Sequence, residues 1–292
     1  MTLPLHILVT GASGFVGQVF IRKALETGHS VTALMRDESN APAGCGVLIH
    51  QLGSGFVPSF PRGINAVLHL AQSRAYRSFP GDADEMFRVN VAGTHEVLLG
   101  AAQADVKSFC LVSTGTVYEP FIAPLKEDSR LSPSSNLGAT KLAAEVLANP
   151  YDALFPVSRL RLFAPYGPGQ IARLIPDLIR RVRAREAVTL PRTGGGMRFV
   201  PTYVDDVCEV MLEAIVQAWS GAYNVASPQA LTIEEVVREI GRAVDCEPVF
   251  DRAAVGAAPL VVPDLTQLSE RYDLSRFRVF ADGLAATLAE KG

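Results

Sequence analysis

The sequence predicts an α/β protein built on a doubly wound parallel sheet, and two observations support this prediction. Apolar runs of strand length alternate with segments of helical period, an order that places helices on both faces of a parallel sheet. The first apolar run, Leu5–Thr10, leads directly into the glycine-rich turn Thr10–Gly17 and a helix-like stretch. Ligands bind such sheets beyond the carboxyl ends of the strands, so the residues that follow each strand form the candidate site.

The strands and helices follow from these patterns in chain order. The expected strands are Leu5–Thr10, Val31–Met35, Gly46–His50, Ala66–Ala71, Phe109–Ser113 and Val157–Phe163. The expected helices between them are Gly14–Thr27, Ala83–Ala104 and Leu137–Ala148. Their alternation predicts right-handed crossovers and therefore a parallel sheet.

The turn after the first strand is suited to holding a dinucleotide pyrophosphate. Gly11 permits the tight turn, Gly14 lets the backbone approach the phosphates, and Gly17 lets the helix pack closely on the strand. The helix that begins there presents unpaired N–H groups to an anion. The remaining residues of the predicted cofactor turn are Ser13, Phe15 and Val16.

Composition and charge narrow the class of protein. The chain has 292 residues, of which 48% are apolar and 20% charged, as is typical of a globular protein. Its net charge of −3 gives no reason to expect nucleic acid as a partner. The four cysteines are scattered without a CxxC pair, so neither a disulfide framework nor a zinc site is expected.

No apolar run reaches the roughly 18 residues of a membrane span. The early glycine turn leaves no room for a cleavable signal, so we expect a cytoplasmic location.

The pattern changes after Ala164. A breaker cluster, Pro165–Gly169, is followed by the basic segment Ile171–Arg185, whose arginines either hold an anionic substrate or form a solvated helix face. Thr232 and Glu235 have the spacing of a capping box and predict the start of an amphipathic helix. We expect this part of the chain to form a smaller lid at the ligand edge of the sheet.

The glycine turn is one of an ordered series of motifs. The others are His69–Ala71, Asn90–Thr94, Val112–Tyr118, Gly138–Glu145, Tyr166–Gly169, Tyr203–Val207 and Tyr223–Ala226. Together they resemble the extended short-chain dehydrogenase/reductase family, also called NAD-dependent epimerase/dehydratases. The resemblance implies a Rossmann domain for NAD(P) at residues 1–165, to which 202–228 returns, and a substrate-binding lid formed by 166–201 and 229–292. It also implies cofactor contacts from Leu70, Ala71, Asn90 and Lys141.

The catalytic set of the family is incomplete in this chain. That set is a Ser or Thr, a Tyr and a Lys, the last two spaced YxxxK; Thr114 and Lys141 match, but Leu137 occupies the tyrosine position. A phenol can exchange a proton with a substrate hydroxyl or ketone, whereas leucine cannot. Tyr118 and Tyr166, on loops after the fifth and sixth strands, are candidate replacements or else structural. Lys141 contacts the cofactor ribose or, alternatively, is an ordinary solvent-facing lysine.

The resemblance also bears on the choice of cofactor. The residue at the end of the second strand normally is an acid that binds the adenosine ribose and selects NAD. Met35 stands at that position, and Arg36, which follows it, could pair with a 2′-phosphate. NADP is therefore favoured over NAD. Gln51 stands where the family often has an Asp that contacts the adenine amine, and its carbonyl can accept the same hydrogen bond.

Many relatives act on nucleotide-diphosphate sugars, and four places in the chain bear on that substrate. Gly115–Thr116 replaces the Asp–Glu pair of the dehydratases and disfavours dehydration. Ala164 stands where an Asn often lies near the substrate, and Arg198 resembles an arginine that binds the diphosphate, with its spacing off by about one residue. Asp205–Asp206 is either a catalytic carboxylate pair or the acidic start of a helix, which is the favoured interpretation.

Three functional hypotheses remain, and the first is favoured. The chain is an NAD(P)-dependent oxidoreductase or epimerase for a nucleotide sugar or related carbonyl compound, in which Thr114 polarises the carbonyl and Lys141 orients the nicotinamide ribose. In this hypothesis another group or water supplies the proton. Leu137 supports the second hypothesis, a dinucleotide-binding sensor, regulator or assembly partner without redox turnover. The third is an enzyme of the same fold without hydride transfer. A homodimer is expected from the resemblance, because relatives often dimerise through the helices that flank the Tyr/Lys position.

Overall fold

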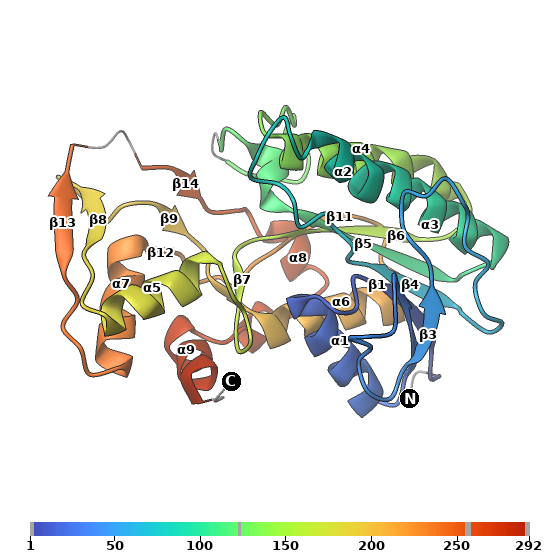
Figure 1. Cartoon of the computed structure of the whole chain (residues 1–292), viewed down its shortest axis with the longest axis horizontal. Coiled ribbons are helices and arrows are strands. Elements are labelled where there is room, and N and C mark those ends of the chain that lie inside the picture. The colour runs from blue at the N-terminus through green and yellow to red at the C-terminus, as the bar shows by residue number, and fades with distance from the viewer. Residues whose placement is uncertain (1–2, 122–123, 255–257, 290–292) are drawn as a thin grey trace. The chain divides into compact units, whose positions relative to one another are not determined.

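The computed structural model describes residues 3–121, 124–254 and 258–289, which pack into two units (Figure 1). The first unit consists of Met1–Pro120, Arg130–Leu162 and Cys208–Tyr223, and the second of Phe121–Ser129, Phe163–Val207 and Asn224–Gly292. The expected domain ranges placed Phe121–Ser129 with the sheet. In the structure Leu125 pairs instead with Pro263, and its carbonyl oxygen accepts a hydrogen bond from Asn224 Nδ2 at 3.0 Å.

The first unit is built around a seven-stranded sheet with the strand order β11-β6-β5-β4-β1-β2-β3. Its strands are β1 (His6–Thr10), β2 (Ser30–Met35), β3 (Gly46–Ile49), β4 (Ala66–His69), β5 (Ser108–Thr114), β6 (Val157–Leu162) and β11 (Gly221–Val225). All five pairings among β1 to β6 are parallel, which confirms the predicted doubly wound sheet. The strand order changes direction between β1 and β4, and sheets of this kind bind their ligands at that point, beyond the carboxyl ends of the strands. β11 is not among the predicted strands, because its five residues contain no clear apolar run.

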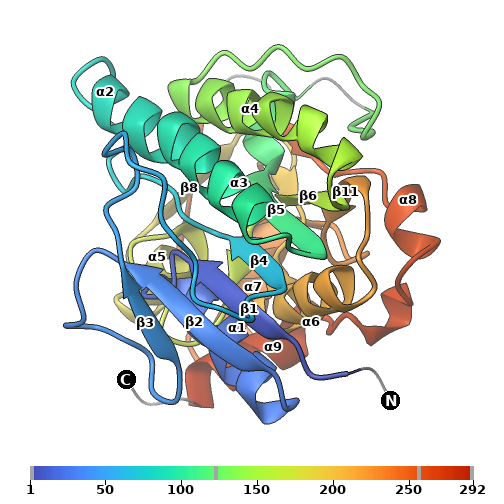
Figure 2. The ribbon, with the colours of Figure 1, turned by 90° about the vertical axis from the view of Figure 1, so that its right-hand side faces the viewer.

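Helices cover both faces of this sheet (Figure 2). One face carries α2 (Ala83–Met86), η1 (Phe87–Ala92), α3 (Gly93–Gln103) and α4 (Asn136–Ala148). The other carries α1 (Phe15–Glu26) and the part of α6 (Val204–Val216) from Cys208 onward. Lys23 of α1 and Glu209 of α6 form an ion pair at 2.6 Å, which joins the two helices of that face. The short 3₁₀ helices η2 (Gly115–Tyr118) and η3 (Asn149–Ala153) complete the unit.

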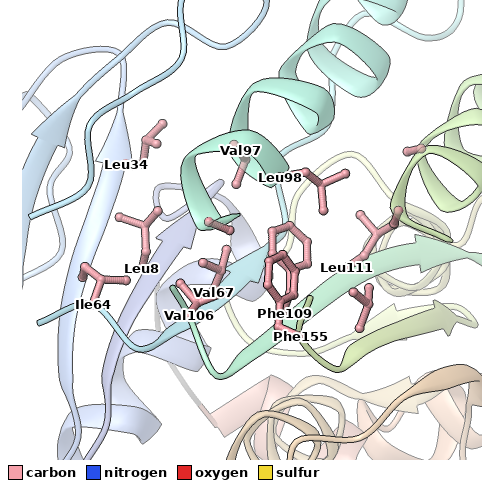
Figure 3. Packing of buried hydrophobic residues seen from close by; sticks show 14 residues of the cluster. Leu8, Leu34, Ile64, Val67, Val97, Leu98, Val106, Phe109, Leu111 and Phe155 are labelled. Atoms are coloured by element: carbon pink, nitrogen blue, oxygen red, sulfur yellow. The ribbon is translucent and has the colours of Figure 1, made fainter. Parts of the chain in front are cut away.

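The core of the first unit lies between the sheet and α3 (Figure 3). Val97 and Leu98 of α3 point onto the strands, where fully buried Leu8, Val67 and Phe109 meet them. Burial of each such side chain contributes about 1.5–3 kcal/mol. Close packing therefore fixes the positions of the strand ends, from which the candidate site residues project.

The predicted helix Ala83–Ala104 contains an unpredicted π-helical turn, η1. Within it the fully buried Asn90 donates from Nδ2 to Thr140 Oγ1 at 3.0 Å and accepts the Ser73 N–H at 2.9 Å. The Thr94 hydroxyl donates to the Asn90 carbonyl oxygen at 2.6 Å. The wider turn lets Asn90 join α4 to the segment after β4, and π-turns of this kind occur often at functional sites.

The second unit combines short strands with helices. Its strands are β7 (Pro165–Tyr166), β8 (Val188–Pro191), β9 (Arg198–Phe199), β10 (Thr202–Tyr203), β12 (Leu231–Thr232), β13 (Phe250–Ala253) and β14 (Leu260–Val261). Its helices are α5 (Leu174–Arg183), α7 (Ile233–Ala243), α8 (Thr266–Ser269), η4 (Leu274–Arg276) and α9 (Phe280–Ala289). The predicted capping box at Thr232 and Glu235 is present at the start of α7. On α5, Arg180 and Arg181 form ion pairs with Asp177, as on a solvated helix face.

Candidate functional site

The glycine turn between β1 and α1 has the geometry of a phosphate cradle. Gly11 has a φ of +69°, and a Cβ at this position would lie 2.9 Å from the Ala71 backbone nitrogen. A Cβ on Gly17 would lie 2.4 Å from the Gly11 carbonyl oxygen, so only glycine allows this approach of helix and strand. Within the described residues no side chain caps α1 at Gly14, which leaves the first turn to an anion. Ser13 lies in this turn, and Phe15 and Val16 begin the helix.

The ends of β2 and β3 place the predicted adenosine contacts along the same edge of the sheet. Met35 is the buried last residue of β2, Arg36 follows it in an exposed bend, and Gln51 is exposed after β3. Buried Glu96 of α3 fixes the loop that follows Gln51. Its carboxylate accepts the Gly53 N–H at 2.9 Å, the Gly55 N–H at 2.7 Å and a bond from His50.

A buried histidine holds the end of β4 against the glycine turn. His69 Nδ1 lies 2.8 Å from Thr10 Oγ1, and Nε2 lies 3.0 Å from Thr94 Oγ1. Because the Thr94 hydroxyl donates to a carbonyl, it must accept from Nε2–H, which leaves Nδ1 to accept from Thr10. Burial and the nearby charge of Lys141 lower the pKa of His69 to about 3, so this side chain is neutral. Thr10 Oγ1 also accepts the Ala71 N–H at 3.1 Å, which fixes the segment containing Leu70 and Ala71.

The structure brings Thr114, Leu137 and Lys141 to the end of β5 and the adjoining turn of α4. Thr114 ends β5, and its Oγ1 accepts the Thr116 N–H at 3.2 Å and lies 2.9 Å from Thr116 Oγ1. Leu137 is half-buried, one helical turn before Lys141. Ser135 caps this helix by accepting the Gly138 N–H.

Lys141 is buried, so the interpretation of this residue as solvent-facing is wrong. Its Nζ donates to the Val112 carbonyl oxygen at 2.5 Å, which anchors the side chain beside β5. Burial lowers the pKa of Lys141 to about 8, while the negative charge of Glu145 acts in the opposite direction. Burial makes the charged form of the amine less stable, so a hydrogen bond from the ammonium to an acceptor stabilises it.

A buried polar cluster, composed of Ser113, Tyr118, Glu145 and Arg161, joins β5, η2, α4 and β6. Arg161 binds the Glu145 carboxylate through Nε and through Nη2, the latter at 2.8 Å, and both side chains are 95% buried. The Ser113 hydroxyl donates to the same carboxylate. Arg161 Nη1 donates to the Tyr118 hydroxyl at 2.7 Å, and its guanidinium lies 5.0 Å from the ring centroid. Tyr118 therefore has a structural partner. Sequence reasoning missed the ion pair, although the two arginines within the strand Val157–Leu162 were a signal of it.

The other predicted catalytic and substrate residues belong to the second unit. Tyr166 is 99% buried, its hydroxyl donates to the Phe280 carbonyl oxygen at 3.1 Å, and burial raises its pKa. Ala164 has a φ of +38°, and its carbonyl accepts the Thr202 N–H at 3.1 Å. Arg198 is exposed on β9 and donates to the Ala230 carbonyl oxygen at 3.1 Å.

Asp205 and Asp206 lie in the first turn of α6, as the helix-start interpretation of this pair predicts. Asp206 is buried and accepts the Arg278 N–H at 2.8 Å. Across residues 3–121, 124–254 and 258–289, no group of three or more His, Cys, Asp or Glu side chains could hold a metal ion. In the same ranges, none of the helices is long and apolar enough to span a membrane.

Comparison with known proteins agrees with this geometry. Residues 7–226 match the model of the NAD dependent epimerase/dehydratase family. The chain is 31% identical to the low-salt glycan biosynthesis protein Agl12 of Haloferax volcanii, over 85% of this chain and 87% of that protein. It is 30% identical to the dTDP-glucose 4,6-dehydratase of Streptomyces griseus, over 97% and 93% of the two chains. The solved structure of MoeE5 in complex with UDP-glucose and NAD is 27% identical, with a TM-score of 0.81 and 97% of each chain covered. The glycine turn, the parallel sheet and these matches together place the chain in the NAD-dependent epimerase/dehydratase family.

Proposed function

We propose that this protein is an oxidoreductase or epimerase that uses a nicotinamide dinucleotide to act on a nucleotide-diphosphate sugar or a related carbonyl compound. The uncapped glycine turn at the carboxyl edge of the sheet is the observation that carries the proposal, because it is suited to a pyrophosphate. The dTDP-glucose named for one relative and the UDP-glucose bound to MoeE5 support a nucleotide sugar as substrate.

The described residues have distinct roles in this proposal. The turn Gly11–Gly17 holds the pyrophosphate, Arg36 and Gln51 contact the adenosine, and the segment after β4 borders the cofactor. Lys141 donates to the nicotinamide ribose, and Thr114 donates to the oxygen of the reacting substrate carbon. When bound, the dinucleotide supplies the hydride acceptor. We assign Ala164 and Arg198 to substrate contacts, and Leu70, Ala71, Asn90 and Met35 to the support of the cofactor.

Dinucleotide binding without redox turnover is the second candidate, and Leu137 is the observation that favours it. The i, i+4 position beside Lys141 carries no group that exchanges a proton. In this case the same turn and the same lysine bind the dinucleotide, while no hydride moves. The two candidates therefore differ in turnover and agree in binding.

Calorimetric titration with NAD, NADP and their reduced forms is the test of both candidates. We expect binding by the natural chain and loss of binding by Gly17→Val, because the added atoms meet the Gly11 carbonyl oxygen. Gly46→Ala on exposed β3 is the matched control and should bind normally. UDP-glucose or dTDP-glucose is then added to the oxidised complex. An oxidoreductase should leave the nicotinamide reduced, whereas an epimerase, which returns the hydride to the sugar, should leave it oxidised and release the epimer. Binding with neither outcome would favour the second candidate, and absence of binding would contradict both.

The choice between NAD and NADP has its own variant within this titration. The MoeE5 complex contains NAD, whereas the exposed Arg36 after buried Met35 favours a 2′-phosphate. If Arg36 pairs with that phosphate, Arg36→Ser should weaken NADP by about tenfold, equivalent to about 1.4 kcal/mol, and leave NAD unchanged. Equal effects on the two dinucleotides would contradict a preference for NADP.

We also propose that two copies of the chain associate through the helical layer of α4 and η1. Val146 on α4 and Phe87 on η1 are 57% and 56% exposed, although both are large apolar side chains. Sedimentation velocity should show a dimer that Phe87→Glu and Val146→Glu dissociate. Ile171→Glu, at a more exposed apolar residue of the second unit, is the matched control. A monomer at all concentrations of the natural chain would contradict this proposal.

A further inference from the structure

The loop 50–55, which follows β3, lies at the same edge of the sheet as the glycine turn. β3 pairs with β2 and β2 with β1, both in parallel, so the carboxyl ends of the three strands are neighbours (Figure 2). The His50 N–H donates to the Met35 carbonyl oxygen at 2.8 Å, which joins the start of the loop to the end of β2. β3 lies two strand spacings, about 10 Å, from β1. A ribose and a purine that extend from a pyrophosphate at the glycine turn can reach that far.

One buried carboxylate, that of Glu96 on α3, holds this loop on both sides of Gln51. Glu96 Oε2 accepts the Gly53 N–H at 2.9 Å and lies 3.1 Å from His50 Nε2, and Oε1 accepts the Gly55 N–H at 2.7 Å. The Glu96 side chain is 4% exposed, whereas Gln51 is exposed between the anchored positions. The loop therefore presents Gln51 to solvent from a fixed backbone.

These contacts need a carboxylate and not merely a side chain of the same shape. The N–H groups of Gly53 and Gly55 donate to different oxygens of Glu96, so both oxygens must accept. An amide at this position would turn its NH2 group toward one of the two donors, whichever way it lay. That backbone N–H would then lose its partner, and the loop would lose one of its anchors.

The loop also lies directly on the backbone of the helices beneath it. Gly53 has a φ of +77°, and a Cβ at this position would lie 2.4 Å from the Arg88 carbonyl oxygen of η1. A Cβ on Gly93, the first residue of α3, would lie 2.9 Å from Leu52 Cβ. Close packing and the Glu96 carboxylate together determine where the Gln51 backbone lies.

We propose that Glu96 is the positioning residue that lets the loop 50–55 select adenine in the bound dinucleotide, an inference that rests on the proposed function. The Gln51 side chain has one carbonyl and one NH2 group, which match the amine donor and the ring-nitrogen acceptor on the Watson–Crick edge of adenine. This pairing needs the Gln51 backbone at one place, and Glu96 fixes the chain before and after it. Glu96 thus acts on the base through Gln51 and not by its own contact.

Titration with two dinucleotides measures this selection. They are the form that the chain binds more tightly, NAD or NADP, and its etheno derivative, in which a bridge closes the Watson–Crick edge of the adenine. We expect the natural chain to prefer the unmodified form by about tenfold, the contribution of one or two hydrogen bonds. Gln51→Leu and Glu96→Gln should each lower this preference to within about twofold. The double variant should show the same low preference as either single variant, because both residues act through one contact.

Further variants separate the loop position from the loss of a carboxylate or of a glycine. Gly53→Ala keeps Glu96 but displaces the loop from η1, so it should also lower the preference for the unmodified form. Gly28→Ala is its matched control, since Gly28 has a φ of +86° and its Cβ would meet no described atom within 4 Å. Asp84→Asn, at a carboxylate that is 82% exposed on α2, is the control for Glu96→Gln. Both controls should keep the preference of the natural chain.

The contrary outcomes distinguish this inference from the proposed function. Equal binding of the unmodified and etheno forms by the natural chain would overturn the role of Glu96 and leave the proposed function standing. The same holds if Glu96→Gln weakens both forms by one factor, since Glu96 would then be structural, or if Gly53→Ala keeps the full preference. If the natural chain binds no dinucleotide at all, the proposed function fails, and the assignment of Glu96 fails with it.

Discussion

Replacement of Glu145 by Gln should lower the free energy of unfolding by about 3–5 kcal/mol. The two side chains of the Glu145–Arg161 pair are each 95% buried, so the variant leaves a guanidinium charge in the interior with no counter-ion. Arg161 also holds the Tyr118 hydroxyl, and the Ser113 hydroxyl would lose its carboxylate acceptor. Chemical denaturation of the natural chain and the variant measures the difference.

Two controls separate the buried charge from a general effect of losing a carboxylate. Glu239→Gln removes one partner of the exposed pair with Arg242 and should change stability by at most about 1 kcal/mol. Replacing both members of the buried pair, as Glu145→Leu with Arg161→Met, should recover part of the loss, because no charge remains unpaired. A Glu145→Gln variant as stable as the natural chain would mean that Arg161 is solvated, contrary to its burial.

The sequence was sufficient to predict the sheet, because residues that are neighbours in the chain indicate each strand. Each of the six predicted strands is an apolar run next to turn residues, and all six occur in the structure within a few residues of the predicted bounds. The role of Gly11 could also be predicted from neighbouring residues, because so tight a turn needs a positive φ and therefore glycine. The capping box at Thr232 is also a pattern of neighbouring residues.

The features that were not predicted depend on contacts between distant residues. The π-turn at Asn90 is associated with bonds to Ser73 and to Thr140, which lies 50 residues away in the chain. The pairing of Glu145 with Arg161 depends on how α4 packs on the sheet, which no periodicity encodes. Local patterns therefore predicted the edge of the sheet that carries the candidate site, and tertiary contacts determined the surroundings of its side chains.

The burial of Lys141 should appear as a pH dependence of stability that Lys141→Met removes. The pKa of Lys141 falls from 10.5 to about 8 on folding. Between these two values the unfolded chain holds the proton and the folded chain does not, so stability rises with pH across this window. A fall of the pKa by one corresponds to about 1.36 kcal/mol, so the whole window is worth about 3 kcal/mol. Below about pH 8 Lys141 is protonated in both the folded and the unfolded chain. The free energy of unfolding is then lowered by the full cost of burying this charge.

The free energy of unfolding of Lys141→Met minus that of the natural chain isolates this effect, because groups common to both chains cancel. This difference should be constant below about pH 8 and should shrink by about 3 kcal/mol as the pH approaches 10.5. Lys107→Met, at an exposed lysine paired with Asp105, is the control for the loss of a lysine from the surface. The same Lys141→Met variant should bind the dinucleotide about 10-fold to 100-fold more weakly, since a charged hydrogen bond to the ribose is worth about 1.5–3 kcal/mol. A pH-independent difference would mean that the amine is solvated. Unchanged dinucleotide affinity would mean that Lys141 does not contact the cofactor and that its bond to Val112 is purely structural.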